Sequence, residues 1–391
     1  MPARAARRML QRTMTTRVLI AGGGVAALEA LLALRADAGD LVDLTLVADT
    51  DTFAYRSLQV GEAFGVGRPQ RYPLASLVEG AGGRFVRASI ASVSAGAREV
   101  RLDDGSRLSY DALLLALGAR SVPAFDHGIT FTPASFEEVL EDLRADFTGD
   151  VTVVVPEGVL WSLAAYELAL MTAAWNRNVV VRLVTHEARP LEIFGPEAAG
   201  AVADVLDREG VELVAGVTPD VPDEGLVRAG DRWLRAGRVV SLPVAVGPRL
   251  IGVPATAGGY LDCDQHGRVR TVPGLWAAGD GTSQPIKQGG LAAQQADAAA
   301  ADIARRAGAA TRPRPFRPVL RGLLRTAGGP LYLRRALAIE DGGVTVSDEP
   351  LWWPPSKVAS RRLAAHLARI DVAVDSGRRL PSGGFALAAL R

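Results

Sequence analysis

The chain has 391 residues and nearly balanced charge, with 44 Lys and Arg against 43 Asp and Glu and a formal net charge of +1. This balance leaves no broad basic surface, which argues against nucleic acid as a main partner. Hydrophobic residues make up 48% of the chain and charged residues 22%, as in an ordinary globular protein. The length predicts two or three domains, since one hydrophobic core does not grow to this size. Cys263 is the only cysteine and there are four histidines, so the sequence indicates no redox cysteine pair, disulfide framework or metal site.

Residues 1–16 are interpreted as a disordered extension, with Met14 as an alternative start of the chain. They contain four arginines and no acid, and they lack the apolar core of a secretory signal. No run of eighteen apolar residues occurs anywhere in the sequence, so no membrane-spanning helix is expected. A cytoplasmic location is the default expectation.

The stretch that follows is the most informative in the chain. An apolar strand, Arg17–Ala21, runs into Gly22-Gly23-Gly24-Val25-Ala26-Ala27, and a helical stretch follows. The pattern is the G-x-G-x-x-A of a dinucleotide-binding turn. Gly22 permits the tight turn, Gly24 lets a pyrophosphate approach the main chain, and Ala27 lets the helix pack closely on the strand. The free N–H groups and the dipole at the helix start favour phosphate, so we predict a dinucleotide site here.

Further elements follow in an alternating order. Leu41–Val47 is a second strand and completes a βαβ unit. Glu99–Leu102 and Arg107–Ser109 flank an Asp-Gly turn and predict a hairpin. The apolar run Ala112–Leu117 predicts a strand buried on both faces, which Gly118 ends.

A second βαβ unit is predicted from strands Val151–Val155 and Val179–Thr185 around a helix over Leu163–Ala174. After it come a helix over 201–210, extended stretches over 211–214 and 239–246, the strand and small-residue turn 274–281, and an Ala-rich helix over 291–307. Three prolines between 313 and 318 then mark a change of composition. The last eighty residues are therefore expected to form a separate segment.

Four motifs stand in one order: GGGVAA, YDALLLALGA, the second βαβ unit, and WAAGDG before a helix. In this order the chain resembles the two-dinucleotide-binding-domain flavoproteins of the pyridine nucleotide–disulfide oxidoreductase superfamily. Within that superfamily it is most similar to sulfide:quinone oxidoreductases and type II NADH dehydrogenases. The closer likeness rests on Phe53-Ala54-Tyr55-Arg56, Tyr166-Glu167-Leu168-Ala169, Thr185-His186-Glu187 with Phe194-Gly195, and Pro285-Ile286-Lys287-Gln288-Gly289-Gly290.

The resemblance implies an α/β fold with two Rossmann-like domains. The FAD-binding domain would comprise residues 17–120 and 246–310. An NAD(P)-binding-like domain over 121–245 would interrupt it. Residues 311–391 would form a C-terminal segment.

The resemblance also implies which residues contact FAD. The glycine turn would face the pyrophosphate, the main chain after the third strand would return to the cofactor, and an acid after WAAG would hold its ribityl part. The next helix would aim its N-terminus at the flavin, where its dipole stabilises negative charge. The implied set is Gly22, Gly23, Gly24, Ala26, Ala27, Ala116, Leu117, Gly118, Gly279, Asp280, Gln288 and Gly289.

Four more residues are candidates, each with an alternative. Lys287 could add a full positive charge at the flavin and is the candidate catalytic residue; the alternative is a solvated loop lysine. Tyr55 and Arg56 either line the flavin site or pack within a loop. His186 is either a proton carrier or a strand-end surface histidine.

The chain departs from the resemblance at the end of the second strand. An acid usually stands there and binds the adenosine ribose, but this chain has Ala48, followed by Asp49. Loss of a charged hydrogen bond costs about 1.5–3 kcal/mol, which weakens FAD binding without abolishing it. Asp49 either replaces the acid through a shifted turn or is only a turn residue.

The second nucleotide fingerprint is degenerate. After Val155 the chain reads PEGVLWSLAA, in which only Gly158 remains of the glycines and bulky Leu160 and Trp161 stand where main chain must approach phosphate. The second strand of this unit ends in Thr185 rather than an acid. These features argue against nicotinamide binding by the ordinary geometry and leave NAD(P) open as a cofactor. Glu167 keeps its place on the helix, where packing or capping alone would also explain it.

The C-terminal stretch LWWPPSKVASRRLAAHLARI predicts an amphipathic helix capped by Ser356. Ala359, Leu363, Leu367 and Ile370 form its apolar stripe, and the rest is basic. One interpretation is peripheral contact of residues 352–370 with the inner face of a membrane. The other is docking on the protein's own core or on a second subunit.

These observations favour an FAD-dependent oxidoreductase. It would pass electrons from NAD(P)H or an unidentified small-molecule donor through the flavin to a quinone or similar acceptor. The single cysteine excludes a cysteine relay of sulfide oxidation and disulfide reductase chemistry, which both need two sulfurs within bonding range. The alternative is a flavin-binding protein with a sensory or structural role and little turnover. The sequence indicates no oligomeric state.

Overall fold

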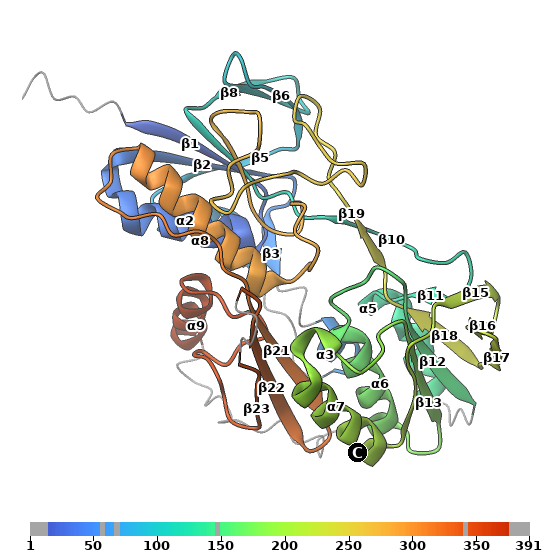
Figure 1. Ribbon diagram of the computed structural model, residues 1–391. Helices are drawn as coiled ribbons and strands as arrows, with labels where there is room; N and C mark the ends of the chain where they lie inside the picture. Colours follow the sequence, from blue (N-terminus) through green and yellow to red (C-terminus); the bar gives the residue numbers. More distant parts are fainter. Residues whose placement is uncertain (1–14, 55–58, 66–70, 145–148, 339–342, 375–391) are drawn as a thin grey trace, which may run out of the picture.

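The computed structural model describes residues 15–54, 59–65, 71–144, 149–338 and 343–374. Two parallel sheets lie at opposite ends of the molecule, and the C-terminal segment runs along both (Figure 1). The predicted α/β class is therefore confirmed. Most of the expected N-terminal extension lies outside the described residues, and Thr16 already belongs to the first strand.

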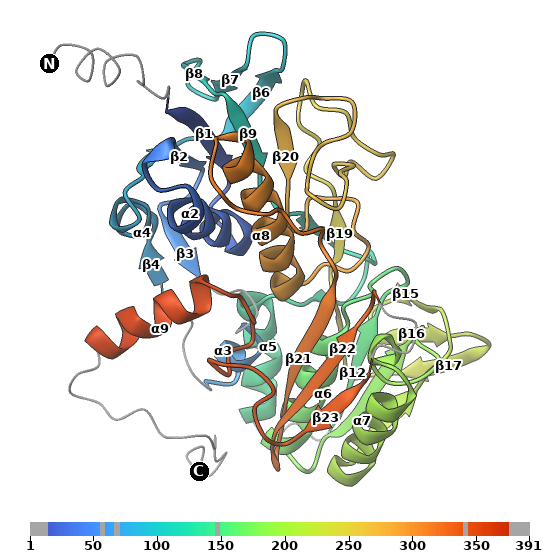
Figure 2. The ribbon, with the colours of Figure 1, turned by 60° about the vertical axis from the view of Figure 1, so that its left-hand side comes forward.

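The first sheet has five parallel strands in the order β20-β9-β1-β2-β5. Helices α2 and α8 pack together on one face, and the sheet β6-β7-β8 covers the other (Figure 2). The chain leaves this sheet after β9 and returns to it only with β20. The strands are β1 Thr16–Ala21, β2 Val42–Ala48, β5 Arg84–Arg87, β9 Ala112–Leu115 and β20 Leu275–Ala277. The covering elements are α2 Val25–Ala38, α8 Gly289–Arg306, β6 Ile90–Ser94, β7 Glu99–Leu102 and β8 Arg107–Ser109.

The second sheet also has five parallel strands, in the order β11-β18-β12-β13-β14. Helices cover one face and a three-stranded meander packs on the other. The strands are β11 Ile129–Thr130, β12 Asp150–Val155, β13 Val180–Thr185, β14 Val211–Val214 and β18 Arg238–Ser241. The covering elements are α5 Pro133–Arg144, α6 Leu163–Trp175, α7 Pro196–Glu209, β15 Pro219–Asp223, β16 Leu226–Ala229 and β17 Arg232–Arg235.

Two antiparallel strands, β10 (Arg120–Val122) and β19 (Val244–Val246), carry the chain between the sheets. The apolar stretch 239–246 is thus two strands in different sheets rather than one. A second link is the arm between β3 (Thr52–Ala54) and β4 (Arg71–Pro73), which pair with each other beside α4 (Leu74–Gly80). The arm carries α3 (Gln59–Ala63) to α5 and α6, where Phe64 is buried against Phe136 and Trp175.

The C-terminal segment forms an antiparallel sheet of β21 (Val319–Thr326), β22 (Gly329–Ala336) and β23 (Thr345–Ser347). This sheet lies beside α6 (Figure 2). Its apolar side chains Leu320, Leu324 and Leu333 join the core around α6. The chain then crosses back to the first sheet and ends its described part in α9 (Leu363–Val374). This segment therefore ties the two sheets together.

The expected C-terminal helix begins six residues later than predicted, at Leu363 instead of at Lys357 after the Ser356 cap. The residues in between form neither helix nor strand, and they run past the start of α8, where Val358 lies against Gly289. Ser360 Oγ, rather than Ser356, accepts a hydrogen bond from the first turn, at the Ala364 amide. Leu363 and Leu367 are buried on α2, so the apolar stripe docks on the protein's own core.

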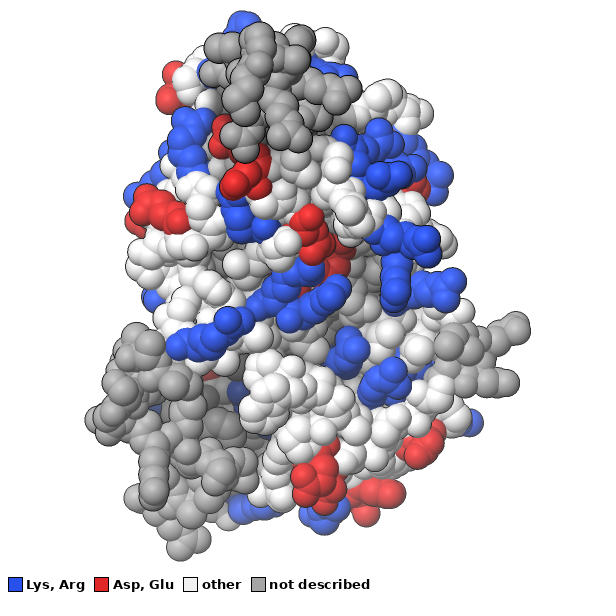
Figure 3. All heavy atoms as spheres, turned by 90° about the vertical axis from the view of Figure 1, so that its left-hand side faces the viewer, with Lys and Arg blue, Asp and Glu red and all other residues white. Residues whose placement is uncertain are grey.

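Basic and acidic side chains are interspersed on the face that Figure 3 shows, as expected for a chain of nearly zero net charge. Within the described ranges, the helices are too short or too polar to cross a bilayer. The same ranges hold no cluster of three or more His, Cys, Asp or Glu side chains placed to hold a metal.

A carboxylate from α2 caps the N-terminus of α9. The buried Glu29 accepts hydrogen bonds of 2.7 Å from the amides of both Arg362 and Leu363. The Arg362 side chain extends the contact by ion pairs to Asp297 of α8 and Asp37 of α2. Burial, with the nearby Asp297 charge, raises the pKa of Glu29 to about 7 from an ordinary value of 4.5, although the two amides oppose the shift.

This shift predicts a pH dependence of stability. Between about pH 4.5 and 7 the folded chain holds a proton on Glu29 that the unfolded chain has released, so the free energy of unfolding falls as pH rises through this window. The loss from this one group is roughly 3 kcal/mol at most. Denaturant unfolding at pH 5 and pH 7 measures it. Glu29→Gln is expected to flatten the slope, and an identical slope in both proteins would refute the assignment.

Candidate cofactor site

The turn after β1 is built so tightly that Gly22 tolerates no side chain. Its φ is +120°, and a Cβ would lie 2.2 Å from the carbonyl oxygen of Ala116. At Gly23 a Cβ would lie 2.7 Å from the Cδ1 of Leu74. Gly22 is thus required by a main-chain contact that lets the end of β9 lie against the turn, whereas the contact at Gly23 is with the end of a leucine side chain.

Gly24 differs from the other two glycines, because no described neighbouring atom would touch a Cβ there. It is the N-cap residue of α2, and the structure shows no side-chain cap there. A Cβ on Gly24 would meet no atom of the described residues within 4 Å. The first amides of α2 therefore face room that a phosphate would fill, and such amides bind anions. Ala26 and Ala27 are buried directly behind this helix start.

The loops after β9 and β20 meet the glycine turn. Gly118 and Gly279 both have positive φ, at +69° and +88°. A Cβ on Gly279 would lie 3.1 Å from that of Ala26, and one on Gly281 would lie 2.8 Å from the Gly118 carbonyl oxygen. The carboxyl ends of three parallel strands thus converge, which is where ligands bind in such sheets. The structure brings Gly22–Ala27, Ala116–Gly118 and Gly279–Asp280 together as the sequence predicted.

Two residues that the sequence analysis missed hold the loop after β20. The Gln295 side-chain oxygen of α8 accepts a hydrogen bond of 2.6 Å from the Gly279 amide. The Thr282 hydroxyl donates to the Gly279 carbonyl at 2.9 Å. Both side chains are buried. A polar residue inside the Ala-rich helix was the only signal in the sequence that could have pointed to Gln295.

Lys287 lies at the end of the same loop and is half-buried. Its Nζ donates to the carbonyls of Thr282, at 2.7 Å, and Gln284, at 2.6 Å, and lies 3.8 Å from the ring centroid of Tyr260. Burial lowers the pKa of Lys287 to about 8, and the Asp280 charge opposes this shift. The simple picture of a solvated loop lysine is therefore wrong, since the ammonium group is held in place.

The start of α8 is more enclosed than expected. The Gln288 side chain caps its own helix by accepting a hydrogen bond of 2.7 Å from the Leu291 amide, and its Nε2 donates to the Arg321 carbonyl. Val358 covers Gly289, at 3.1 Å from the place of a Cβ. The C-terminal segment thus packs on the same helix start that is predicted to approach the flavin.

The adenosine end of the predicted site lacks the usual acidic residue at the end of β2. Ala48 is buried, with 3% of its surface exposed, and cannot bind a ribose. Asp49 is exposed in the turn that follows. Tyr55 and Arg56 lie outside the described residues, so their candidate roles stay predictions.

Glu167 belongs to a buried ionic cluster that the sequence did not predict. Its carboxylate, 1% exposed, accepts from Arg325 of β21 at 3.0 Å and from Lys357 of the C-terminal segment at 2.5 Å. Burial lowers the pKa of Lys357 to about 8, and the Glu167 charge opposes the shift. Glu167 therefore joins α6, beside the second sheet, to the C-terminal segment. Its partner Lys357 directly precedes Val358, the residue that covers the start of α8. His186, at the end of β13, is half-buried.

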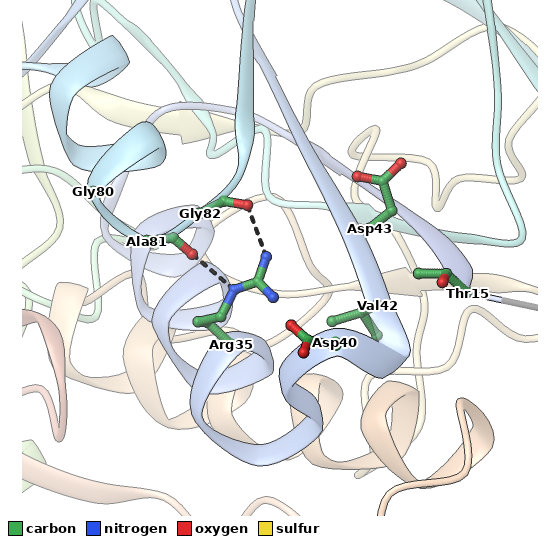
Figure 4. Close-up of a pocket in the computed structure, with 8 residues that line it drawn as sticks. All are labelled: Thr15, Arg35, Asp40, Val42, Asp43, Gly80, Ala81 and Gly82. Atoms are coloured by element: carbon green, nitrogen blue, oxygen red, sulfur yellow. Dashed lines mark hydrogen bonds between the residues drawn. The ribbon is translucent and has the colours of Figure 1, made fainter. Parts of the chain in front are cut away.

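Other candidate features lie apart from this site. Cys263 is half-buried in an isolated bridge to Val269, and burial with two neighbouring aspartates raises its thiol pKa to about 12. A hollow of about 590 Å³ lies at the amino ends of β1 and β2, opposite the converging loops (Figure 4). Arg35 lines this hollow, but its guanidinium already donates to the carbonyls of Ala81 and Gly82 at 2.8 Å.

Comparison with known proteins places the chain in a family. The ferredoxin–NAD(+) reductase component of the p-cumate 2,3-dioxygenase system of Pseudomonas putida is 29% identical over 299 residues, covering 69% of this chain and 68% of the relative. An NADH dehydrogenase-like protein of Mycobacterium tuberculosis is 27% identical over 289 residues, covering 68% and 72%. The structure of the sulfide:quinone oxidoreductase from Aquifex aeolicus superposes with a TM-score of 0.77 at 20% identity, covering 85% of this chain and 86% of that one.

The sequence profile of the family described as pyridine nucleotide-disulphide oxidoreductase matches residues 16–300. This match confirms the predicted superfamily, and with it an FAD-dependent oxidoreductase. The chain therefore belongs to the pyridine nucleotide–disulphide oxidoreductase family.

Proposed function

We propose that the chain binds FAD at the three converging loops and passes electrons from a small-molecule donor to a quinone or similar carrier. The observation that carries this proposal is the uncapped start of α2, where Gly24 leaves room for an anion. The amides of α2 would bind the pyrophosphate, and Asp280 would hold the ribityl part of the cofactor. When bound, FAD supplies a centre that takes up electrons from one partner and delivers them to another.

The protein's own groups set the surroundings of that centre. Gln295 and Thr282 fix the loop that carries Asp280. Lys287 places an ammonium group beside this loop. Gln288 and Gly289 belong to the end of α8 that would approach the flavin.

A quinone-like acceptor is supported by likeness of fold. A sulfide:quinone oxidoreductase shares this fold over most of both chains. On the donor side, a cysteine relay is excluded here, because Cys263 is the only cysteine and its raised pKa keeps it a thiol. An oxidised protein carrier, which the name of the ferredoxin reductase suggests, is the other acceptor to assay. The apolar stripe of α9 gives no support to membrane contact, since it is buried on α2.

Gly24→Glu tests the site, because its carboxylate would occupy the space of the phosphate and repel it. We expect a folded protein that has lost FAD, since no described atom would clash with the new Cβ. Gly200→Glu is the matched control: that glycine is exposed on α7, and a Cβ there also meets no described atom within 4 Å. The visible spectrum measures the FAD content. Equal flavin in both variants would contradict the assignment.

Lys287 is proposed as the positive charge that stabilises reduced flavin. Lys287→Met should shift the midpoint potential of the bound flavin to more negative values by about 30 mV, which corresponds to about 1.4 kcal/mol for two electrons. Lys287→Arg should restore most of the shift. Redox titration with a reference dye gives the potentials. An unchanged potential in Lys287→Met would contradict this role and leave the lysine only its contacts to two carbonyls and to the Tyr260 ring.

A further inference from the structure

We infer that the second sheet does not bind a dinucleotide, because the C-terminal hairpin β21–β22 occupies the helix start that would bind one. NAD(P)H is then not the electron donor of this protein, although relatives are named as NAD-linked reductases. This inference rests on the proposed function only in assuming that FAD is the electron carrier. Its structural basis is independent of that assumption.

The start of α6 is the place where a pyrophosphate would lie, and it is covered. Leu163, the first residue of α6, is 4% exposed. Gly322 of β21 lies so close that a Cβ would be 2.8 Å from both Leu163 Cδ1 and Phe194 Cζ. The Trp161 ring packs on Phe194, with 5.8 Å between ring centroids. Side chains and the hairpin thus cover the start of α6, whereas the corresponding start of α2 is open at Gly24.

The hairpin is held there by several contacts from different strands. Arg335 of β22 donates to the Ile193 carbonyl at 2.8 Å. Arg325 of β21 pairs with the buried Glu167 one turn into α6. Gly195 lies beside Val344, which would be 3.0 Å from a Cβ there. Figure 2 shows β21, β22 and β23 running along α6 and α7. The hairpin therefore packs directly on α6 and on the loop before α7.

At the end of β13 in the second sheet, the position that would bind a ribose is also inaccessible. Thr185 ends β13, where an acid would bind ribose hydroxyls, and it is fully buried. The next acid, Glu187, is 3% exposed and turns inward, where it accepts from the Tyr166 hydroxyl at 2.7 Å and from Thr185 at 3.1 Å. Pro156 at the end of β12 has no amide to offer. Thr185 and Glu187 are thus buried and bonded within the protein, and Pro156 offers no amide, so these three positions leave no group for a ribose or a phosphate.

Nucleotide titration of the full chain tests the inference. NADH and NADPH are added anaerobically to flavin-loaded protein, with dithionite as the control that reduces any accessible flavin. We expect no bleaching by either nucleotide over minutes, and rapid bleaching by dithionite. Saturable bleaching by NADH or NADPH would overturn the inference.

Calorimetry with the same nucleotides separates this inference from the proposed function. Protein that takes up no FAD would refute the proposed function, and nucleotide binding can still be measured on it. No binding heat up to millimolar nucleotide supports the closed site on either form of the protein. Saturable binding on either form overturns it.

Two glycine variants test whether the hairpin packs on the start of α6. Gly322→Val would press on Leu163 and Phe194, so its melting temperature should fall by roughly 5 °C. Gly328→Val, in the turn of the same hairpin, is the control, because the nearest atom to its Cβ is 3.8 Å away. Equal melting temperatures for the two variants would show that the hairpin does not pack on the start of α6.

Discussion

Glu167→Ala is expected to lower the free energy of unfolding by about 3–5 kcal/mol, because it removes the buried carboxylate that Lys357 and Arg325 both contact. The carboxylate is 1% exposed, and it pairs with Arg325 and with the almost fully buried Lys357. Denaturant unfolding at neutral pH measures the loss. The variant should also loosen residues 357–363 from α8, which limited proteolysis would detect.

An exposed ion pair provides the control for this prediction. Glu137 pairs with Arg144 on α5, and both side chains are about half exposed. Glu137→Ala should cost less than about 1 kcal/mol, since solvent screens such pairs. A Glu167→Ala protein as stable as Glu137→Ala would show that the cluster does not join the C-terminal segment to the second sheet.

Gly22→Ala is expected to lower stability by about 3 kcal/mol or more and to abolish FAD binding. The methyl group would combine an unfavourable positive φ with a position 2.2 Å from the Ala116 carbonyl oxygen, which is main chain and cannot rotate away. Relief of this contact would separate the turn from β9, and the three loops would no longer converge.

Gly24→Ala is the matched control, two residues along the same turn. Its φ is −90°, and a Cβ meets no described atom within 4 Å, so its stability should stay within about 1 kcal/mol of the natural protein. Melting curves of both variants without added cofactor give the comparison. Similar losses at the two positions would contradict the distinct roles assigned to Gly22 and Gly24.

Local patterns explain what could be predicted from the sequence. The turn from Gly22 to Ala27, the Asp-Gly hairpin and the buried strand before Gly118 are each set by a few adjacent residues, and the structure confirms all three. The family resemblance then supplied the convergence of these loops with Gly279 and Asp280. No single local pattern contains that information.

Contacts between distant residues explain what could not be predicted. Lys357 meets Glu167 across 190 positions, and Glu29 caps a helix that starts 334 positions later. The pattern around Ser356 resembles a helix start, but the chain first passes Gly289 in an irregular stretch, and the helix begins only at Leu363. Likewise, the degenerate second fingerprint showed what was missing, whereas the hairpin that fills its place appears only in three dimensions.

The FAD content of the purified full chain tests the central claim most directly. Protein incubated with excess FAD, and then separated from free cofactor, should retain a stoichiometric amount with the two visible absorption bands of protein-bound flavin. A folded protein that stays colourless after this treatment would contradict the account, because the open helix start beside Gly24 would then hold no diphosphate.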